Sequence, residues 1–258
     1  MCNGVATELP KYIHVTRRTP LLCELHSHTT FSDGSLTPRE LVDLYGFAGF
    51  DVLAVTDHVC RREAMSAGAR ALPAETHADY LACLELEAER AWQVYRLLLI
   101  PGLELTYDDS DPALAAHAVA VGLRSWASLD DGLDAALTAA RADGAALIGA
   151  HPYTPEGVAG STRGTARFAA QREWSRELVH RFELYNRHEH FPWVAEERLP
   201  VVANGDFHRL EHLETWKTLL PCEHTEEAVL EYLRSGGEVG LVPFETGRSA
   251  ARLAASAA

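Results

Sequence analysis

Two short apolar runs near the start of the chain each end in histidine. Residues 21–25 lead into His-Ser-His at residues 26–28, and a second run at residues 51–55 leads into Thr-Asp-His. Alternate side chains of a β-strand point to the same face, so His26 and His28 could bind one ion together. Imidazole is a common ligand of borderline-soft metals. A metal site at a strand end is therefore one interpretation of this pair, and two structural histidines are the other.

Strand patterns and helix patterns alternate along the rest of the chain. Apolar runs predict strands, and apolar residues at helical spacing predict helices between them. Such alternation favours a parallel sheet with helices outside, and about seven or eight units suggest closure into an α/β barrel. Pro101 falls inside the third run, where it could break the strand. The predicted strands cover residues 21–25, 51–55, 97–105, 116–122, 145–150, 180–184, 200–203 and 238–242, and the predicted helices cover 38–48, 75–95, 129–142, 168–178 and 225–235.

The length of the chain suits one domain of this kind. Of its 258 residues, 47% are hydrophobic, which is enough for a large core, and α/β barrels of this size commonly form a single domain. We expect a polar leader at residues 1–20, a barrel domain at residues 21–248, and a flexible alanine-rich tail at residues 249–258.

The net charge limits the kinds of partner. A formal charge of -14 argues against a general basic surface that holds long nucleic acid or anionic lipid. A short phosphorylated substrate is still compatible with it, because local metal charge can outweigh the global field. No apolar run suits a membrane span or a signal sequence, and the five cysteines show no Cys-x-x-Cys spacing. These features predict a soluble, cytoplasmic protein with no membrane partner, and they leave the oligomeric state open.

Residues that can bind metals recur near the ends of the predicted strands and in the loops beside them. In parallel α/β barrels the site lies at the C-terminal ends of the strands, so side chains from separate strands would converge there. Each residue alone has an ordinary explanation, such as a turn, a cap or a satisfied core histidine. Six histidines and three carboxylates together are poorly explained in that way. The nine residues are His26, His28, Asp33, His58, Glu104, His117, His151, Asp206 and His208.

The order of these residues resembles the PHP (polymerase and histidinol phosphatase) family of metal-dependent phosphoesterases. The motifs of that family are His-x-His-Thr, Ser-Asp-Gly, Thr-Asp-His, Pro-Gly-x-Glu, a following histidine, His-Pro and Asp-x-His. The resemblance covers about residues 21–242. The matching residues are 26–29, 32–34, 56–58, 101–104, His117, 151–152 and 206–208.

This resemblance implies a distorted TIM-like (β/α)7 barrel with a trinuclear metal site at the C-terminal ends of the strands. It also implies hydrolysis of a small phosphate ester, either a phosphomonoester or a nucleotide phosphate. Two departures from the family pattern stand out. Gly205 replaces a commoner serine, and no large inserted domain separates Asp57 from Glu104.

The resemblance further implies three divalent ions, which could be Zn, Mn or Fe. Three such ions and three carboxylates would leave a net positive charge at the site, which suits a phosphate dianion. A metal-activated hydroxide would attack the phosphorus, with Glu104, Asp206 and His208 acting at the reaction centre. The implied ligands are His26, His28, Glu104 and Asp206 for a first ion, Glu104, His117 and His151 for a second, and Asp33, His58 and His208 for a third.

Four further residues are candidates for roles around the metals. Asp57, beside His58, could fix the tautomer of an imidazole, although capping a helix is an equal alternative. Arg163 could clamp a phosphate because its guanidinium offers two parallel donors, and Arg61, Arg62 and Arg209 are rivals for this role. His188 could reach a substrate from a strand end, or it could lie in a solvated loop, and Lys217 is a further candidate for phosphate binding. We expect surface or structural roles for five other histidines, namely His14, His77, His180, His212 and His224.

Two other functions are alternatives to phosphate ester hydrolysis. Amidohydrolase-type enzymes, which hydrolyse C–N or C–O bonds, also begin with His-x-His on a barrel strand, but many of them use a carboxylated lysine to bridge two metals. The chain contains only Lys11 and Lys217, neither at a middle strand end, which disfavours that class. A non-catalytic PHP-like module could lose ligands without penalty, whereas all nine positions are filled here. Catalysis is therefore the favoured prediction.

Overall fold

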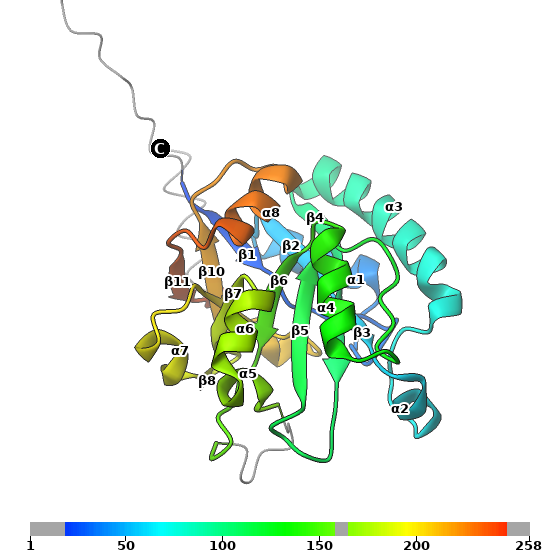
Figure 1. Cartoon of the computed structure of the whole chain (residues 1–258). Helices are drawn as coiled ribbons and strands as arrows, with labels where there is room; N and C mark the ends of the chain where they lie inside the picture. The colour runs from blue at the N-terminus through cyan, green and yellow to red at the C-terminus, as the bar shows by residue number, and fades with distance from the viewer. Residues whose placement is uncertain (1–18, 158–164, 247–258) are drawn as a thin grey trace, which may run out of the picture.

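The computed structural model describes residues 19–157 and 165–246. In these residues strands and helices alternate, as the sequence predicts (Figure 1). The strands are β1 (Leu21–Glu24), β2 (Val52–Val55), β3 (His58–Val59), β4 (Leu98–Tyr107), β5 (Ala116–Val121), β6 (Ala146–Ala150), β7 (Arg181–Asn186), β8 (Glu189–His190), β9 (Val201–Asn204), β10 (Trp216–Leu220) and β11 (Gly240–Pro243). The helices are α1 (Pro38–Phe47), α2 (Arg62–Ser66), α3 (His77–Tyr95), α4 (Leu133–Ala142), α5 (Arg167–Ala170), α6 (Arg172–Leu178), α7 (Pro192–Glu196) and α8 (Glu226–Ser235), with short 3-10 turns at Ala74–Thr76 and Leu210–His212.

The strands form one curled sheet that closes on itself. The hydrogen-bonded order is β11-β10-β1-β2-β4-β5-β6-β7-β8, while β9 pairs with β7 and β3 pairs with β4. Beyond the end of β9, Phe207 forms a parallel bridge with Ser27, and the amide of His28 donates to the carbonyl of Phe207 over 2.8 Å. The result is a distorted TIM-like (β/α)7 barrel, whose wall consists of β1, β2, β4, β5, β6, β7 and β9.

The sheet is mixed, which corrects the prediction that it is parallel. β5 runs antiparallel to both β4 and β6, and β10 runs antiparallel to β1. The connection between β4 and β5 consists of residues 108–115 and holds no helix. Because a parallel crossover needs about a dozen residues or more, this short connection forces the chain to turn back beside β4.

The proline in β4 does not break the strand. Pro101 occupies the last register position opposite β2, where it faces Val55. The next residue, Gly102, begins the pairing with β5 opposite Val121. Pro101 thus lies where pairing passes from one neighbour to the other, a place where one missing N–H donor is tolerated.

Alternating side chains of the strands divide the apolar core into two clusters. Leu53 and Val55 of β2 pack in the cluster that also holds residues of α1, α3 and α4, whereas Val52 and Ala54 pack in the second cluster on the opposite face of the sheet. Val229 and Leu233 of α8 belong to this second cluster. Helices therefore cover the outside of the sheet, and α8 contributes to the inner cluster (Figure 1).

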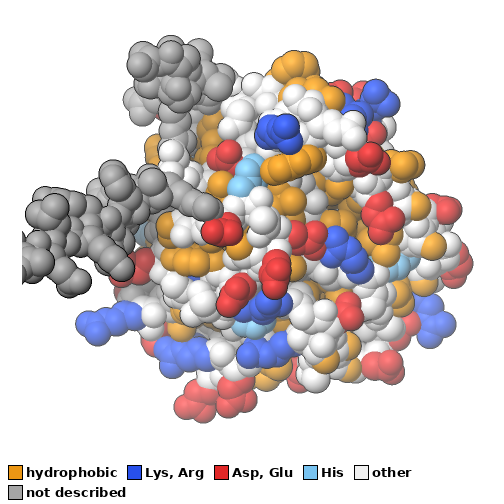
Figure 2. Space-filling model, turned by 90° about the horizontal axis from the view of Figure 1, so that it is seen from above, with side chains coloured by type: hydrophobic (Ala, Val, Ile, Leu, Met, Phe, Trp, Pro, Cys, Tyr) orange, Lys and Arg blue, Asp and Glu red, His pale blue; other side chains and the backbone are white. Residues whose placement is uncertain are grey.

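The face seen in Figure 2 carries charged side chains of both signs. Lys and Arg side chains stand among Asp and Glu side chains and apolar patches there. No helix in the described part of the chain is long and apolar enough to cross a membrane.

Candidate metal centre

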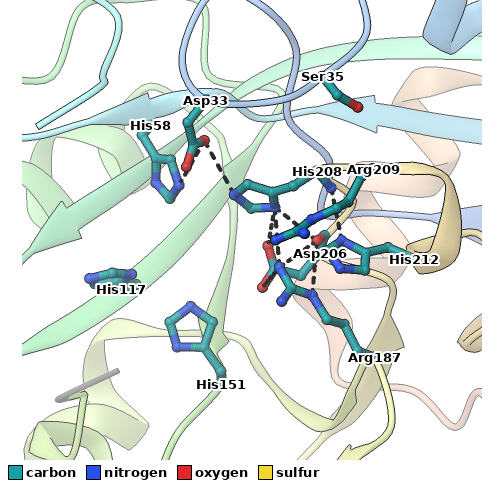
Figure 3. Close-up of a pocket in the computed structure, with 10 residues that line it drawn as sticks. All are labelled: Asp33, Ser35, His58, His117, His151, Arg187, Asp206, His208, Arg209 and His212. Atoms are coloured by element: carbon teal, nitrogen blue, oxygen red, sulfur yellow. Dashed lines mark hydrogen bonds and ion pairs between the residues drawn. The ribbon is translucent and has the colours of Figure 1, made fainter. Parts of the chain in front are cut away.

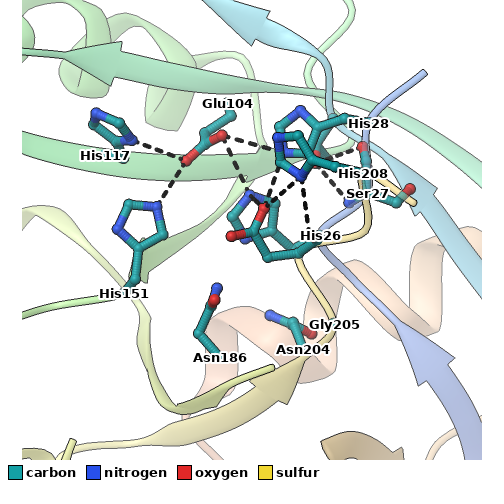
Figure 4. A network of polar contacts seen from close by, with 12 residues as sticks. His26, Ser27, His28, Glu104, His117, His151, Asn186, Asn204, Gly205 and His208 are labelled. Carbon is teal, nitrogen blue, oxygen red and sulfur yellow. Dashed lines mark hydrogen bonds and ion pairs between the residues drawn. The ribbon is translucent and has the colours of Figure 1, made fainter. Parts of the chain in front are cut away.

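The nine ligand-type side chains predicted from the sequence converge at one end of the barrel (Figures 3 and 4). Most of them follow the C-terminal ends of parallel strands, as predicted. His117 is different, because it stands near the start of β5 and reaches the same end only because β5 runs antiparallel. The register places it opposite Thr106 on one side and Ala150 on the other.

The carboxylate of Glu104 lies at the centre of the group. Its Oε2 atom lies 3.2 Å from Nε2 of His26 and 3.3 Å from Nε2 of His28. Its Oε1 atom lies 3.3 Å from Nδ1 of His117 and 3.4 Å from Nε2 of His151. Figure 4 shows Glu104 between these two pairs of rings. Glu104 is fully buried, so a carboxylate without cations would be costly here.

A second carboxylate, Asp33, lies at the more open side of the group. Its Oδ1 atom is 3.5 Å from Nε2 of His58 and 3.2 Å from Nε2 of His208 (Figure 3). The third carboxylate, Asp206, has its Oδ1 atom 3.4 Å from Nε2 of His28 and 3.2 Å from Nδ1 of His208. Asp206 therefore lies between the buried and the open parts of the group.

Three sets of these side chains are close enough to hold a metal ion, with all ligand atoms of a set within 4.8 Å of one another. They differ from the ligand sharing implied by the family resemblance in two respects. His28 belongs to two sets, and Asp206 lies outside the tight set that contains His26. The sets are His26, His28 and Glu104; Glu104, His117 and His151; and His28, Asp33, His58 and His208.

Carboxylates outside the group hold two of the rings by their other nitrogen. Nδ1 of His26 lies 2.9 Å from Oε1 of the buried Glu183, which leaves Nε2 to face Glu104. Nε2 of His117 lies 2.9 Å from Oδ1 of Asp108, which leaves Nδ1 to face Glu104. A carboxylate on the second nitrogen is the usual way in which proteins orient a metal-binding imidazole.

Threonine hydroxyls contact one nitrogen of two further rings and help to orient them. Nδ1 of His58 lies 2.7 Å from Oγ1 of Thr106. Nδ1 of His151 lies 3.1 Å from Oγ1 of Thr165, which also donates to the carbonyl of His151. Nε2 of His151 faces Glu104. His58 contacts two carboxylates of the group, because its Nε2 atom lies 3.5 Å from Oδ1 of Asp33 and its Nδ1 atom also lies 2.8 Å from Oε2 of Glu104.

The surroundings of the rings shift their pKa values in opposite directions. Burial favours the neutral form of His117, but hydrogen bonds to Asp108 and Glu104 outweigh burial and raise the pKa of His117 to about 9. Burial also opposes charge on His208, yet Asp206 and Asp33 raise its pKa to about 9. His28 differs, because burial and its histidine neighbours hold its pKa well below the ordinary value.

Unpartnered buried atoms test whether a metal suits this group. Within residues 19–157 and 165–246, nearly every buried side-chain nitrogen or oxygen that lacks a hydrogen-bond partner belongs to it; His77 Nε2 is the exception. Buried polar atoms are normally satisfied, so a cluster of exceptions fits a site that is built to bind cations. Imidazole and carboxylate together suit Zn, Mn or Fe. The atoms are His26 Nε2, His28 Nδ1 and Nε2, Asp33 Oδ1, Glu104 Oε1 and Oε2, and His117 Nδ1.

Three of the five non-glycine residues with a positive φ in the described part of the chain lie at the same place. His151, Arg187 and Asp206 have φ angles of 28°, 55° and 45°, in a region that side chains other than glycine rarely occupy. Each such residue costs on the order of 1–3 kcal/mol unless its surroundings impose the conformation. All three directly or closely follow the end of a strand, so the strain turns the chain sharply at the site.

A cavity of about 460 Å³ opens onto the group. Sequence reasoning missed Arg187, whose Nη2 atom lies 3.2 Å from Oδ2 of Asp206 and donates to the carbonyl of Asp206 over 3.0 Å. The sequence offered one signal for Arg187, namely its position directly after the strand β7. His151, a predicted ligand, directly follows β6 in the same way. The lining residues are Asp33, Ser35, His58, His117, His151, Arg187, Asp206, His208, Arg209 and His212 (Figure 3).

The structure corrects two predicted roles. Both carboxylate oxygens of Asp57 accept hydrogen bonds from the loop after His28, namely from the amide and hydroxyl of Thr29 and the hydroxyl of Ser32. Asp57 therefore holds that loop and neither caps a helix nor orients an imidazole. Lys217, a candidate for phosphate binding, is fully buried and donates to Glu24, so it does not reach the cavity.

The other candidates have mixed outcomes. His188 lies exposed in the turn between β7 and β8 and does not line the cavity, in agreement with the solvated-loop alternative. Arg163 lies outside the described residues. His212, expected to be a surface or structural residue, lines the cavity, and its Nδ1 atom accepts from the amide of His208 over 3.1 Å.

Comparisons with known proteins agree with this fold. No protein-family model matches the chain, and no curated protein matches it. Among solved structures, the chain is similar to a two-domain protein from Bacteroides vulgatus that contains a predicted PHP-like metal-dependent phosphoesterase. That similarity has 20% sequence identity and a TM-score of 0.65, and it covers 87% of this chain but only 65% of the other. The chain thus spans less than two thirds of that protein and shares its fold.

Two further structures are similar over a smaller part of the chain. A predicted metal-dependent phosphoesterase from Bifidobacterium adolescentis has 17% identity and a TM-score of 0.47, covering 72% of this chain and 87% of that one. An amidohydrolase from Chromobacterium violaceum, solved with sulfate and no metal, has 15% identity and a TM-score of 0.48 with the same coverage.

Proposed function

We propose that this protein hydrolyses a small phosphate ester with divalent metal ions held by the nine converging side chains. The observation that carries the proposal is the set of buried, unpartnered nitrogen and oxygen atoms directed at one another around Glu104. Such an arrangement is costly without cations, and the donor types suit transition metals. A metal-dependent hydrolase explains why the fold maintains it.

The proposed centre is trinuclear. One ion would be held by His26, His28 and Glu104 with Asp206 beside them, a second by Glu104, His117 and His151, and a third by Asp33, His58 and His208 with His28 nearby. When bound, Zn, Mn or Fe ions would acidify a water and neutralise the charge on phosphoryl oxygens. Glu183 and Asp108 would keep the ligating nitrogens of His26 and His117 aimed at the centre.

The cavity favours a small phosphorylated substrate. Arg187 and Arg209 place guanidinium groups on its wall beside Asp206 and His208, where a phosphate oxygen could accept from them (Figure 3). A volume of about 460 Å³ suits a metabolite. The acidic chain offers no general attraction to long nucleic acid.

One experiment tests the proposal. The protein would be stripped with a chelator, reloaded separately with Zn, Mn or Fe, and assayed for phosphate release from a panel of phosphorylated metabolites. We expect about three ions per chain and metal-dependent release of phosphate. Full activity without metal would overturn the proposal. Turnover of a cyclic amide or lactone, with every phosphate ester inert, would place the protein in the amidohydrolase class.

A further inference from the structure

A fully buried ion pair lies behind the ligand group. Nζ of Lys217, on β10, lies 2.6 Å from Oε2 of Glu24, the last residue of β1, and both side chains are 0% exposed. Lysine and arginine together number 23 in the chain, and only two of these residues are lysines. A lysine here is therefore notable, and its compact ammonium fits where a planar guanidinium would need more room.

Glu24 contacts the backbone of both segments that carry buried ligands. Its Oε1 atom accepts from the amide of Gly205 over 2.9 Å and from the amide of His26 over 3.3 Å. Its Oε2 atom accepts from the hydroxyl of Tyr45 over 3.1 Å. One carboxylate thus joins His26, after β1, to the residue that precedes Asp206, after β9.

Lys217 contacts the segment that follows Asp206. Besides Glu24, its ammonium donates to Oγ1 of Thr215 over 2.8 Å and to the carbonyl of His212 over 3.3 Å. These three acceptors match the three donors of an ammonium group. The ring of His212 in turn accepts from the amide of His208, so the ammonium supports the loop that carries two ligands.

Gly205 makes this arrangement possible. A Cβ atom at this position would lie 2.5 Å from Oε2 of Glu24 and closer still to Nζ of Lys217. The glycine that departs from the family pattern is therefore the residue that leaves room for the ion pair. The next residue, Asp206, has a φ of 45°, a strained conformation that needs support from its surroundings.

We propose that the Glu24–Lys217 pair positions the ligand segments of His26 and Asp206, so that its loss weakens metal binding beyond any effect on folding. The inference rests on the proposed function, since it requires that the nine side chains bind metal. Stability alone is a poor reason for such a pair, because well-packed apolar residues often replace buried ion pairs without loss. Removing one partner, in contrast, leaves an uncompensated buried charge.

The test separates positioning from stability. Metal-stripped Lys217→Met, Glu24→Gln and the double variant would be titrated with Zn²⁺ against a chromophoric chelator, and their thermal midpoints measured without metal. Each single variant should unfold at a lower temperature and bind Zn²⁺ at least roughly 10-fold more weakly. The double variant should regain most of the lost thermal midpoint, because no unpaired charge remains, while its Zn²⁺ affinity stays low.

Arg181→Met serves as the matched control. Arg181 is also a buried cation, but its guanidinium donates to the carbonyls of Leu233, Tyr232 and Gly237 near the end of α8. This variant should lose stability and keep the Zn²⁺ affinity of the wild type. If the double variant binds Zn²⁺ as tightly as the wild type, the pair has no positioning role and the inference is wrong. A wild-type protein that binds no Zn²⁺, Mn²⁺ or Fe²⁺ would overturn the proposed function, and this inference with it.

Discussion

His26 and Glu183 are 157 residues apart in the chain, yet Nδ1 of His26 lies 2.9 Å from Oε1 of Glu183. The other oxygen of Glu183 accepts from the amide of His151 and from the side chain of Asn186, each over 2.7 Å. A single buried carboxylate on β7 thus orients one ligand after β1 and another after β6. The orientation of two rings of the proposed metal centre therefore depends on a residue that is not among the proposed ligands.

Glu183→Gln should weaken metal binding while the protein stays folded. Glutamine keeps the shape but loses the charge that directs the Nδ1 proton of His26, and changes of this kind cost roughly 10 to 100-fold in metal affinity. Competition titration with Zn²⁺ measures the effect. Asp108→Asn provides a comparison, and it should have a smaller effect because the side chain of Asp108 is 64% exposed. Equal affinity of Glu183→Gln and the wild type would contradict the role given to Glu183.

Glu104→Gln should be far more damaging than Asp33→Asn. Glu104 is fully buried and faces rings from both sides, whereas Asp33 is 33% exposed and contacts His58 and His208. We expect Asp33→Asn to keep about two ions and some activity, and Glu104→Gln to lose more than roughly 100-fold in activity. Elemental analysis, phosphate release and circular dichroism on both variants measure this. Three ions in Asp33→Asn, or undiminished activity in Glu104→Gln, would show that the ligands are assigned wrongly.

The metal-free protein should lose stability as the pH rises from 6.5 to about 9. His117 and His208 have an ordinary pKa of 6.5 but, despite burial, a pKa of about 9 beside their carboxylates. Below pH 6.5 both rings are protonated in the folded and unfolded chain, and their stabilising contribution is complete. It is lost as the pH passes through the folded pKa of about 9. Thermal midpoints measured with a chelator across this range should fall.

The same measurement with metal supplies the control. Metal ions bind the deprotonated rings, so saturating Zn²⁺ should remove or reverse the fall in thermal midpoint. Asp108→Asn should reduce the fall in the metal-free protein, because it removes one of the carboxylates that raise the pKa of His117. A midpoint that does not change with pH in the metal-free protein would mean that these rings are not charged when folded.

Arg187→Lys should lower kcat/KM on phosphate esters by roughly 10-fold, because lysine keeps the charge but loses the paired donors of the guanidinium. Arg187→Met should lower it further. Arg209→Lys is the matched control on the same wall of the cavity, and it should matter less because the side chain of Arg209 is 67% exposed. Steady-state kinetics at saturating metal measure all three. Wild-type kinetics in Arg187→Met would exclude Arg187 from substrate binding.

Several parts of the site could be predicted from the sequence because they depend on local pattern. His26 and His28 were placed together by the alternation of side chains, and both face Glu104. The other ligand-type residues were found because they stand near strand ends, and strands can be recognised from apolar runs. The barrel itself followed from the alternation of strands and helices.

Tertiary structure alone decided which partner each side chain meets. The antiparallel direction of β5 brings His117 to the site, and a periodic pattern does not report strand direction. In the sequence, nothing distinguishes Glu183 or Lys217 from any other polar residue within a strand. The register of distant strands buries Glu183 beside His26 and Lys217 against Glu24. Local sequence determines which face of an element is apolar. The identity of the neighbour across that face depends on packing between segments that are far apart in the chain.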